Sequence, residues 1–435
     1  MSDTLTITPN SSAAATGGSG LVTVLERITL VPDQPLDNTP AATASRPLSR
    51  IEVHGDLASA EADWRAFDAD AVMTPFQSFV WIAAWQCHVG RLGGTTPAIV
   101  FGRDADGRLL FILPLAIERH AGIRRLCWLA SDLCDYNAPL LARNWPARPG
   151  EFASAWRETM RTLRTTPGFG FDLVDMSKLP QTIDEVRNPF LDLDVLPNAS
   201  SAHIARLFGT WDEYYFEVRS SATRKKERKQ VKQLGEFGEV KFVTVKDNAD
   251  LDGTLATLTT QKTRSFARMG IEDLFARPGY PEFYRDVANN PGLVHVSRLD
   301  VGTTQAATSL GLAFRGCYYL VLSSYDDGEL SKWGPGRAHL RELLRYAIEH
   351  KLNRFDFTIG DELYKRDWAD VELPIYDYVE AATLAGWPFA TAINLYRRAK
   401  RFIKKTPALW SAYSKARALA GGLTARGAVK AEASE

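Results

Sequence analysis

The residues whose types could do chemistry lie close together in the last quarter of the chain. In the strand-like run 354–358, alternation places Asp356 on the face opposite its phenylalanine neighbours. A carboxylate in a short buried strand needs a partner, and Lys365 or Arg366 could supply one. Past the strand end come side chains that could bind a ligand or move protons, namely Asp361, Glu362, Tyr364 and Lys365. Taken alone, the pattern fits either a functional site or a structural ion pair under a loop.

A second candidate is the turn Gly334-Pro335-Gly336-Arg337, which lies between a predicted strand and a predicted helix. A helix N-terminus offers unpaired N–H groups and the positive end of the helix dipole, which together suit an anionic phosphate. The two glycines permit close approach of a ligand to the backbone, the proline pre-sets the first helical turn, and Arg337 could add a charged hydrogen bond. The turn fits a phosphate site or an ordinary helix cap. It lacks the lysine-plus-hydroxyl ending of nucleoside triphosphatases, which disfavours that class.

Predicted helices and strands form two α/β units that would position these motifs. In the first unit we expect a helix at 57–69 and a second helix that starts near 74 and runs through His88. Strands at 98–102, 109–117 and 125–130, a helix at 150–164 and a strand at 171–176 follow. In the second unit we expect a basic helix at 221–234, a strand at 240–245, helices at 249–269 and 279–289, and strands at 294–299, 306–314 and 317–323. An amphipathic helix then follows the glycine turn, and strands at 354–358 and 376–381 complete the unit.

Length and composition agree with two core-bearing units. The 435 residues are 45% hydrophobic and 24% charged, as in a globular protein with enough apolar surface to bury. Lys+Arg and Asp+Glu each total 52, which excludes a uniformly basic surface, and we expect no DNA partner. Four cysteines without a Cys-x-x-Cys pair disfavour disulfides and structural zinc. We therefore expect a reducing cytoplasm and no metal, and no apolar run nears the roughly 18 residues that span a bilayer.

Composition also divides the chain into segments. Residues 1–48 are rich in Ser, Thr, Ala, Gly and Pro and are predicted to be a disordered N-terminal tail. Residues 49–200 and 201–385 form the two predicted lobes, and 386–435 form a basic amphipathic helix and tail. Within that last segment, residues 397–410 interleave basic and apolar side chains, a pattern that could bring the protein to the inner face of an anionic membrane as a peripheral contact.

Several motifs together resemble the CelD-like acetyltransferase family, a branch of the GNAT (Gcn5-related N-acetyltransferase) superfamily akin to the FemAB-type double-GNAT transferases. The resemblance spans about 50–385, and its most specific part is the block from Asp356 to Trp368. It also draws on 75–78 with Trp81 and Trp85, and on 113–115, 135–140, 223–226, 333–336 and 347–352. The resemblance implies an α/β (α+β GNAT-like) fold of two acyl-CoA N-acyltransferase-like lobes, with mixed sheets flanked by helices. It further implies transfer of an acetyl or other acyl group from coenzyme A to an amine or hydroxyl, with a small molecule or glycan precursor as acceptor in polysaccharide biosynthesis.

Carried over residue by residue, the resemblance assigns candidate sites in the second lobe. The strand before the glycine turn would splay from its neighbour, so that Val321 and Ser323 flank the thioester while Gly334, Pro335, Gly336 and Arg337 hold the pyrophosphate. Candidate catalytic groups are Asp361, Glu362 and Tyr325, and candidate acceptor-binding groups are Asp135, Tyr136, Asp356 and Lys365. In one departure from the GNAT pattern, Ser331 stands where a Gln or Arg is usual.

Two further readings stay open at this point. The stretch 219–232 carries seven basic residues against Glu227 alone and could bind the 3′-phosphate of coenzyme A, an anionic polymer or water. A FemAB-like transferase that takes an aminoacyl group from aminoacyl-tRNA to a peptidoglycan precursor would use this stretch for tRNA. A non-catalytic GNAT-fold scaffold in polysaccharide synthesis is the third reading.

Overall fold

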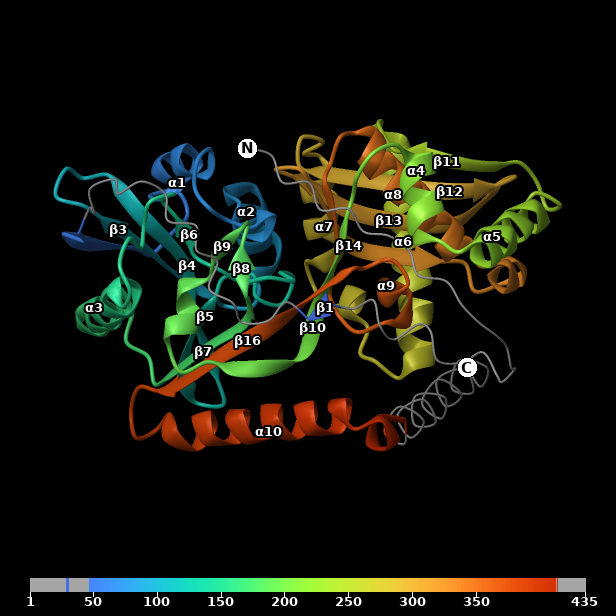
Figure 1. Cartoon of the computed structure of the whole chain (residues 1–435). Helices are drawn as coiled ribbons and strands as arrows, with labels where there is room; N and C mark the ends of the chain where they lie inside the picture. The colour runs from blue at the N-terminus through green and yellow to red at the C-terminus, as the bar shows by residue number, and fades with distance from the viewer. Residues whose placement is uncertain (1–28, 31–46, 412, 414–435) are drawn as a thin grey trace, which may run out of the picture.

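A single mixed β-sheet runs through both lobes of the computed structural model, which describes residues 29–30, 47–411 and 413 (Figure 1). Its strand order is β11-β12-β13-β14-β15-β10-β16-β7-β5-β4-β3-β2, with β1 on β16 and β6 on β4. Helices flank the sheet in each lobe (Figure 1). No helix in the described ranges has the length and apolar character needed to cross a bilayer.

The N-terminal lobe follows the predicted order of helices and strands closely. Its elements are β2 (Arg50–His54), α1 (Glu61–Asp68), η1 (Pro75–Gln77), α2 (Phe79–Trp85), η2 (Gln86–Gly90), β3 (Thr96–Arg103), β4 (Leu109–His120), β5 (Ile123–Trp128), β6 (Leu140–Leu141), α3 (Glu151–Thr165), β7 (Leu173–Pro180), β8 (Thr182–Ile183), β9 (Val186–Arg187) and η3 (Pro189–Asp192). Trp81 and Trp85 are buried in the core. Trp81 also meets Phe283 of the other lobe edge-to-face at 4.9 Å, so the apolar core continues across the lobe boundary.

The C-terminal lobe contains both candidate motifs. Its elements are α4 (Trp211–Val218), α5 (Ser221–Leu234), β11 (Val240–Thr244), α6 (Asn248–Met269), η4 (Leu274–Ala276), α7 (Tyr280–Ala288), β12 (Val294–Val301), β13 (Thr304–Phe314), β14 (Cys317–Tyr325), η5 (Glu329–Trp333), α8 (Pro335–Glu349), β15 (Arg354–Ile359) and α9 (Leu363–Arg366). The apolar side of α8 packs on β14 and β15 through Leu340, Leu343 and Leu344. Phe355 and Phe357 lie in the same cluster, which confirms that Asp356 is on the other face of β15.

Two strands far apart in the sequence join the lobes. β10 (Leu196–Arg206) pairs with β15 on one side and with β16 (Val371–Ala381) on the other, and β16 in turn pairs with β7. The boundary predicted between residues 200 and 201 therefore falls inside β10, and β16 completes the sheet of the first lobe. The sequence analysis did not predict β10, because its small polar run 198–201 lacks hydrophobic alternation. Main-chain hydrogen bonds on both sides hold it in place.

The two chain ends extend beyond the described residues. Most of the tail predicted to be disordered, 1–48, lies outside the described ranges, but Thr29–Leu30 forms β1 and pairs in parallel with β16. The predicted basic helix is α10 (Trp387–Lys405), and the tail from residue 414 lies outside the described part. Figure 1 shows α10 running along one side of the sheet, where it contacts β10, β16 and β7.

Candidate functional site

The candidate site begins where β14 and β15 separate. These parallel strands pair only through Cys317–Tyr319 and Arg354–Asp356, and then diverge. Beyond this point, β14 also carries one extra residue relative to β13, because Leu320 and Leu322 pair with consecutive residues of β13 and leave Val321 as a bulge. The edge of β14 after Tyr319 therefore faces an opening instead of a partner strand.

The N-terminus of α8 forms one end of a cleft at this opening. Gly334 caps the helix in the left-handed conformation at φ +66°, Pro335 follows as the first helical residue, and the first turn contains no acidic side chain. A Cβ atom on Gly336 would lie 3.0 Å from Cδ1 of Tyr325, so glycine keeps the cleft open there. The cleft has a volume of about 540 Å³ and is lined by Gln230, Leu320, Ser323, Ser324, Tyr325, Ser331, Lys332, Gly334, Gly336, Arg337, His339, Leu340, Leu343, Leu363 and Tyr364.

The equivalent opening in the N-terminal lobe is closed by its own side chains. β5 and β7 are also parallel and pair over only two residues before they separate. There the ammonium of Lys178 donates to the main-chain oxygens of Ser131 and Cys134, both at 2.8 Å. At the start of α3, Glu151 accepts hydrogen bonds from two main-chain N–H groups, at 2.8 and 3.2 Å. The Glu151 carboxylate thus already accepts from main-chain N–H groups just before α3, near the helix end that would attract an anion.

Behind the cleft, on the face of β15 away from α8, lies a buried carboxylate held from both lobes. The hydroxyl of Tyr136 donates to Oδ1 of Asp356 at 2.8 Å, and the main-chain N–H of Thr358 donates to the same oxygen at 2.7 Å. No described residue donates to Oδ2. Burial raises the pKa of Asp356 to about 6, and the nearby charge of Asp135 adds to the rise. Thr358 holds φ +60°, a strained value for a β-branched residue, which fixes its N–H toward the carboxylate.

Further charged groups surround this carboxylate. Burial raises the pKa of Asp135, although the ammonium groups of Lys178 and Lys365 oppose the rise. Lys365 is itself buried and donates to the main-chain oxygen of Ile359 and to Glu362, each at 3.0 Å. Burial opposes ionisation of Glu362, but the charge of Lys365, its hydrogen bond to Glu362, a main-chain hydrogen bond and the charge of Lys404 together hold the pKa of Glu362 below its ordinary value.

The sequence analysis named Tyr364 without a specific role and did not single out Lys262, and the structure adds both to the charged cluster. Tyr364 lines the cleft and lies near Ser323, Asp135 and Glu362, and burial raises its pKa well above the ordinary value. Lys262 on α6 faces the same carboxylates, and burial lowers its pKa. Tyr364 stood within the motif block, but no local pattern marks Lys262 among the polar residues of a long helix.

Asp361 lies apart from this cluster. Its oxygens accept hydrogen bonds from the main-chain N–H of Ser201 and from His203, both at 3.3 Å, and the ammonium of Lys404 lies 2.7 Å away. Burial opposes ionisation, but these bonds hold the pKa of Asp361 far below its ordinary value. A carboxylate whose ionised form is so strongly stabilised by hydrogen bonds and an ion pair is a poor proton acceptor. The position of Asp361 therefore does not favour it as the general base.

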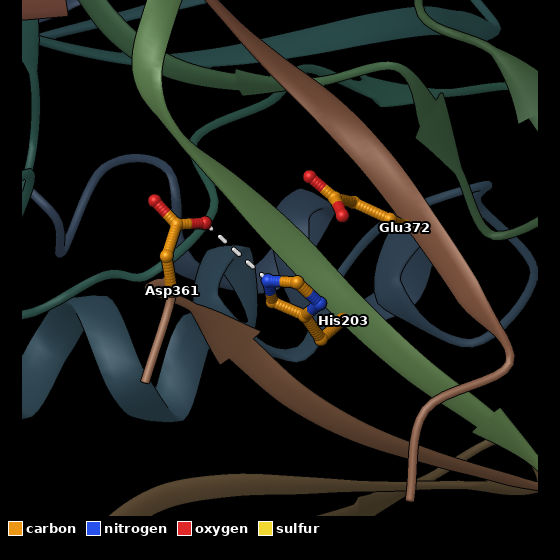
Figure 2. A group of neighbouring side chains, drawn as sticks. All are labelled: His203, Asp361 and Glu372. Atoms are coloured by element: carbon orange, nitrogen blue, oxygen red, sulfur yellow. Dashed lines mark hydrogen bonds and ion pairs between the residues drawn. The ribbon is translucent and has the colours of Figure 1, made fainter. Parts of the chain in front are cut away.

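In Figure 2, His203 on β10 lies between Asp361 and Glu372, which is on β16. One oxygen or nitrogen atom from each of the three side chains lies within 4.8 Å of the other two. Such a set could in principle ligate a metal ion. Because the ammonium of Lys404 already supplies the positive charge at Asp361, we assign the group a structural role that ties α10 to the loop 360–362.

The structure thus brings together most of the residues predicted for the site. Ser323, Tyr325, Gly334, Gly336 and Arg337 line the cleft, and Pro335 is buried at the helix start. Asp135, Tyr136, Asp356, Glu362 and Lys365 form the cluster behind it. The side chain of Val321 packs against the apolar core. The partners of Asp356 differ from the expected pair, because Tyr136 and Thr358 make its hydrogen bonds, whereas Lys365 acts only through its charge and Arg366 does not contribute.

Comparison with known proteins agrees with this geometry. Residues 221–366 match the acetyltransferase (GNAT) domain, so the C-terminal lobe is acyltransferase-like. The structure of FemX superimposes with a TM-score of 0.51 at 10% identity, covering 79% of this chain and 100% of FemX. This likeness shows the fold and confirms the predicted α/β class with two lobes. The L-PGS structure from Bacillus licheniformis also aligns, at 12% identity and a TM-score of 0.44, covering 72% of this chain and 94% of that chain. A tandem GNAT protein from the clavulanic acid biosynthesis pathway aligns at 11% identity and a TM-score of 0.43, covering 77% of this chain and 99% of that chain. No curated protein matches the sequence.

Proposed function

We propose that the protein transfers an acyl group from a coenzyme A thioester to an amine or hydroxyl, with the thioester placed where β14 and β15 separate. The observation that carries this proposal is the open cleft that joins the unpaired edge of β14 to the N-terminus of α8. Main-chain N–H groups along such an edge can stabilise the oxyanion that forms on the thioester carbonyl. The helix terminus, with Lys332 and Arg337 exposed at the cleft, suits the pyrophosphate.

The side chains behind the cleft can handle the protons of this reaction. The acceptor nitrogen or oxygen would bond to the carbonyl carbon, the carbon–sulfur bond would break, and the acceptor proton would pass to Oδ2 of Asp356. A carboxyl group whose pKa is about 6 is largely ionised at neutral pH yet basic enough to accept that proton. Tyr364, beside Ser323 in the cleft, is placed to protonate the departing sulfur.

We propose a glycan precursor as the acceptor, a choice that rests on the resemblance to the CelD-like family. Polar groups from both lobes, including Asp135, Glu362 and Lys365, surround the approach to Asp356 and would suit a hydroxylated acceptor. A second candidate is aminoacyl transfer from tRNA. The observation that favours it is the basic face of α5 beside the cleft, where Lys225, Lys226 and Lys229 are exposed near Gln230.

Calorimetry with acetyl-CoA tests the proposal. Gly334→Asp places a carboxylate where the pyrophosphate would lie, and Gly334→Asn is its matched neutral control, because both side chains tolerate the left-handed backbone similarly. We expect wild type to bind, Gly334→Asn to bind within about threefold of wild type, and Gly334→Asp to bind at least tenfold more weakly.

Equal weakening by both variants would place the pyrophosphate elsewhere. No binding by wild type would overturn the coenzyme A proposal and favour the scaffold reading. Binding of tRNA in its place, with a steep dependence on salt and on Lys225, Lys226 and Lys229, would favour aminoacyl transfer.

A further inference from the structure

Helix α10 has an outward face that no described part of the chain covers. Figure 1 shows the helix lying along the edge of the molecule, with the sheet on one side of it only. The inward face is fully engaged. Phe389, Ala390 and Ile393 pack on the sheet, Arg397 pairs with Asp175 at 2.7 Å, and the Lys404 ammonium makes the ion pair described above. The helix is thus held in place by one face alone.

The outward face is apolar along its length. Trp387, Leu395 and Phe402 recur every seven or eight residues, so they project from the same side of the helix. Their side chains are 64%, 68% and 65% exposed, and Leu384, just before the helix, is 95% exposed. A row of large apolar side chains this exposed is unusual on a monomeric protein and indicates a surface that binds something.

Basic residues without partners border this row. Arg398 follows Leu395 by three positions and Lys405 follows Phe402 by three, so each cation lies beside an apolar side chain. Lys400 and Arg401 lie on the same helix, and none of the four forms an ion pair with any residue in the described ranges. The sequence contains no acidic residue between Glu380 and Glu432 to offset them. The surface therefore presents apolar and cationic groups together.

We propose that the outward face of α10 docks on an anionic lipid bilayer, with Trp387, Leu395 and Phe402 inserted at the level of the headgroups. Helices in the plane of a membrane combine these features: an apolar row, cations at its border, and no charge of the opposite sign. A second copy of the chain fits less well, because a two-fold contact would bring the same unpaired cations together with no carboxylate opposite them. This inference is independent of acyl transfer, since none of these residues lies in the cleft or the charged cluster.

Vesicle flotation with the full-length protein tests the proposal. We expect wild type to float with vesicles of equal phosphatidylcholine and phosphatidylglycerol, to stay unbound with phosphatidylcholine alone, and to dissociate as salt is raised. Arg398→Gln with Lys405→Gln should lower the partition coefficient about 30-fold. Leu395→Asn with Phe402→Asn should lower it at least as much, because it removes two inserting side chains.

Two controls make the result specific to α10. Leu92→Asn removes a side chain that is 67% exposed on another surface, and Lys225→Gln with Lys229→Gln removes two cations from α5. Both variants should bind vesicles like wild type. Failure of wild type to bind anionic vesicles, or equal loss in the α5 variant, would overturn the proposal. Light scattering that finds a wild-type dimer and a monomeric Leu395→Asn/Phe402→Asn variant would assign the face to a second copy instead.

Discussion

Replacement of Asp356 by Asn should stabilise the protein at alkaline pH while it abolishes acyl transfer. Both hydrogen bonds to this carboxylate, from Tyr136 and from the Thr358 N–H, end on Oδ1, which an asparagine can reproduce. The variant therefore keeps the local geometry and removes only the ionisable oxygen. A residue retained for stability alone would show the opposite, a loss of stability on substitution.

The size of the effect follows from the pKa of Asp356, which burial raises from 3.8 to about 6. Each pKa unit corresponds to about 1.4 kcal/mol, so the ionised carboxylate lowers the unfolding free energy by about 3 kcal/mol. Because the pKa is raised in the folded state, the neutral carboxyl group contributes its full stability below pH 3.8. This contribution to the unfolding free energy is lost as the pH rises through 6. The new amide N–H₂ of Asn lacks an acceptor, which costs about 1 kcal/mol. The net gain for Asp356→Asn above pH 7 is therefore on the order of 2 kcal/mol.

Urea unfolding of wild type and Asp356→Asn at several pH values, together with coenzyme A release assays, measures both effects. We expect the variant to be more stable near pH 8, to have no advantage near pH 4, and to lose transfer activity by about 100-fold or more. Asp361→Asn is the matched control of opposite sign, because Lys404 and His203 lower the pKa of Asp361 and its neutralisation should destabilise the protein at neutral pH. If Asp356→Asn is less stable than wild type near pH 8, the reasoning about the buried charge is refuted.

Three further outcomes are expected. Tyr136→Phe removes a hydrogen bond that favours ionised Asp356, so the acid limb of the pH–rate profile should move above pH 6. If the acid limb does not move, a group other than Asp356 controls it. Lys178→Met leaves two main-chain oxygens without their donor and should lower the unfolding free energy by about 2 kcal/mol in urea titrations, without weakening acetyl-CoA binding. Burial raises the pKa of Asp68 from 3.8 to about 7, so stability is lost as the pH rises from 3.8 through 7, and Asp68→Asn should raise the melting temperature at pH 8 but not below pH 3.8.

Features set by neighbouring residues were predictable from the sequence. The bounds of α5, predicted at 221–234, match because Ser220 caps its start and Gly235 ends it. The glycine turn marks the start of α8, since Gly334 adopts a left-handed backbone and Pro335 suits the first helical turn. Alternation in β15 also placed Asp356 on the correct face of the sheet, because successive side chains of a strand point to opposite faces.

Features set by distant residues were not predictable. Tyr136 and Asp356 are 220 positions apart and meet only because β10 and β16 join the two sheets. Glu362 and Asp361 are neighbours of the same charge, yet Glu362 faces the charged cluster while Asp361 binds Lys404 of α10. The backbone at Gly360, with φ +138°, breaks the alternation before them, so counting residues from β15 could not tell which carboxylate faces the charged cluster.

Hydrogen exchange with and without acetyl-CoA tests most directly whether the opening in the C-terminal lobe is the thioester site. The account predicts slower exchange at 320–325 on β14 and at the first turn of α8, where main-chain N–H groups would bind the ligand. The equivalent segments of the N-terminal lobe, at the end of β5 and the start of α3, should not change, because Lys178 and Glu151 already occupy them. Protection at the N-terminal segments, or at neither set, would contradict it.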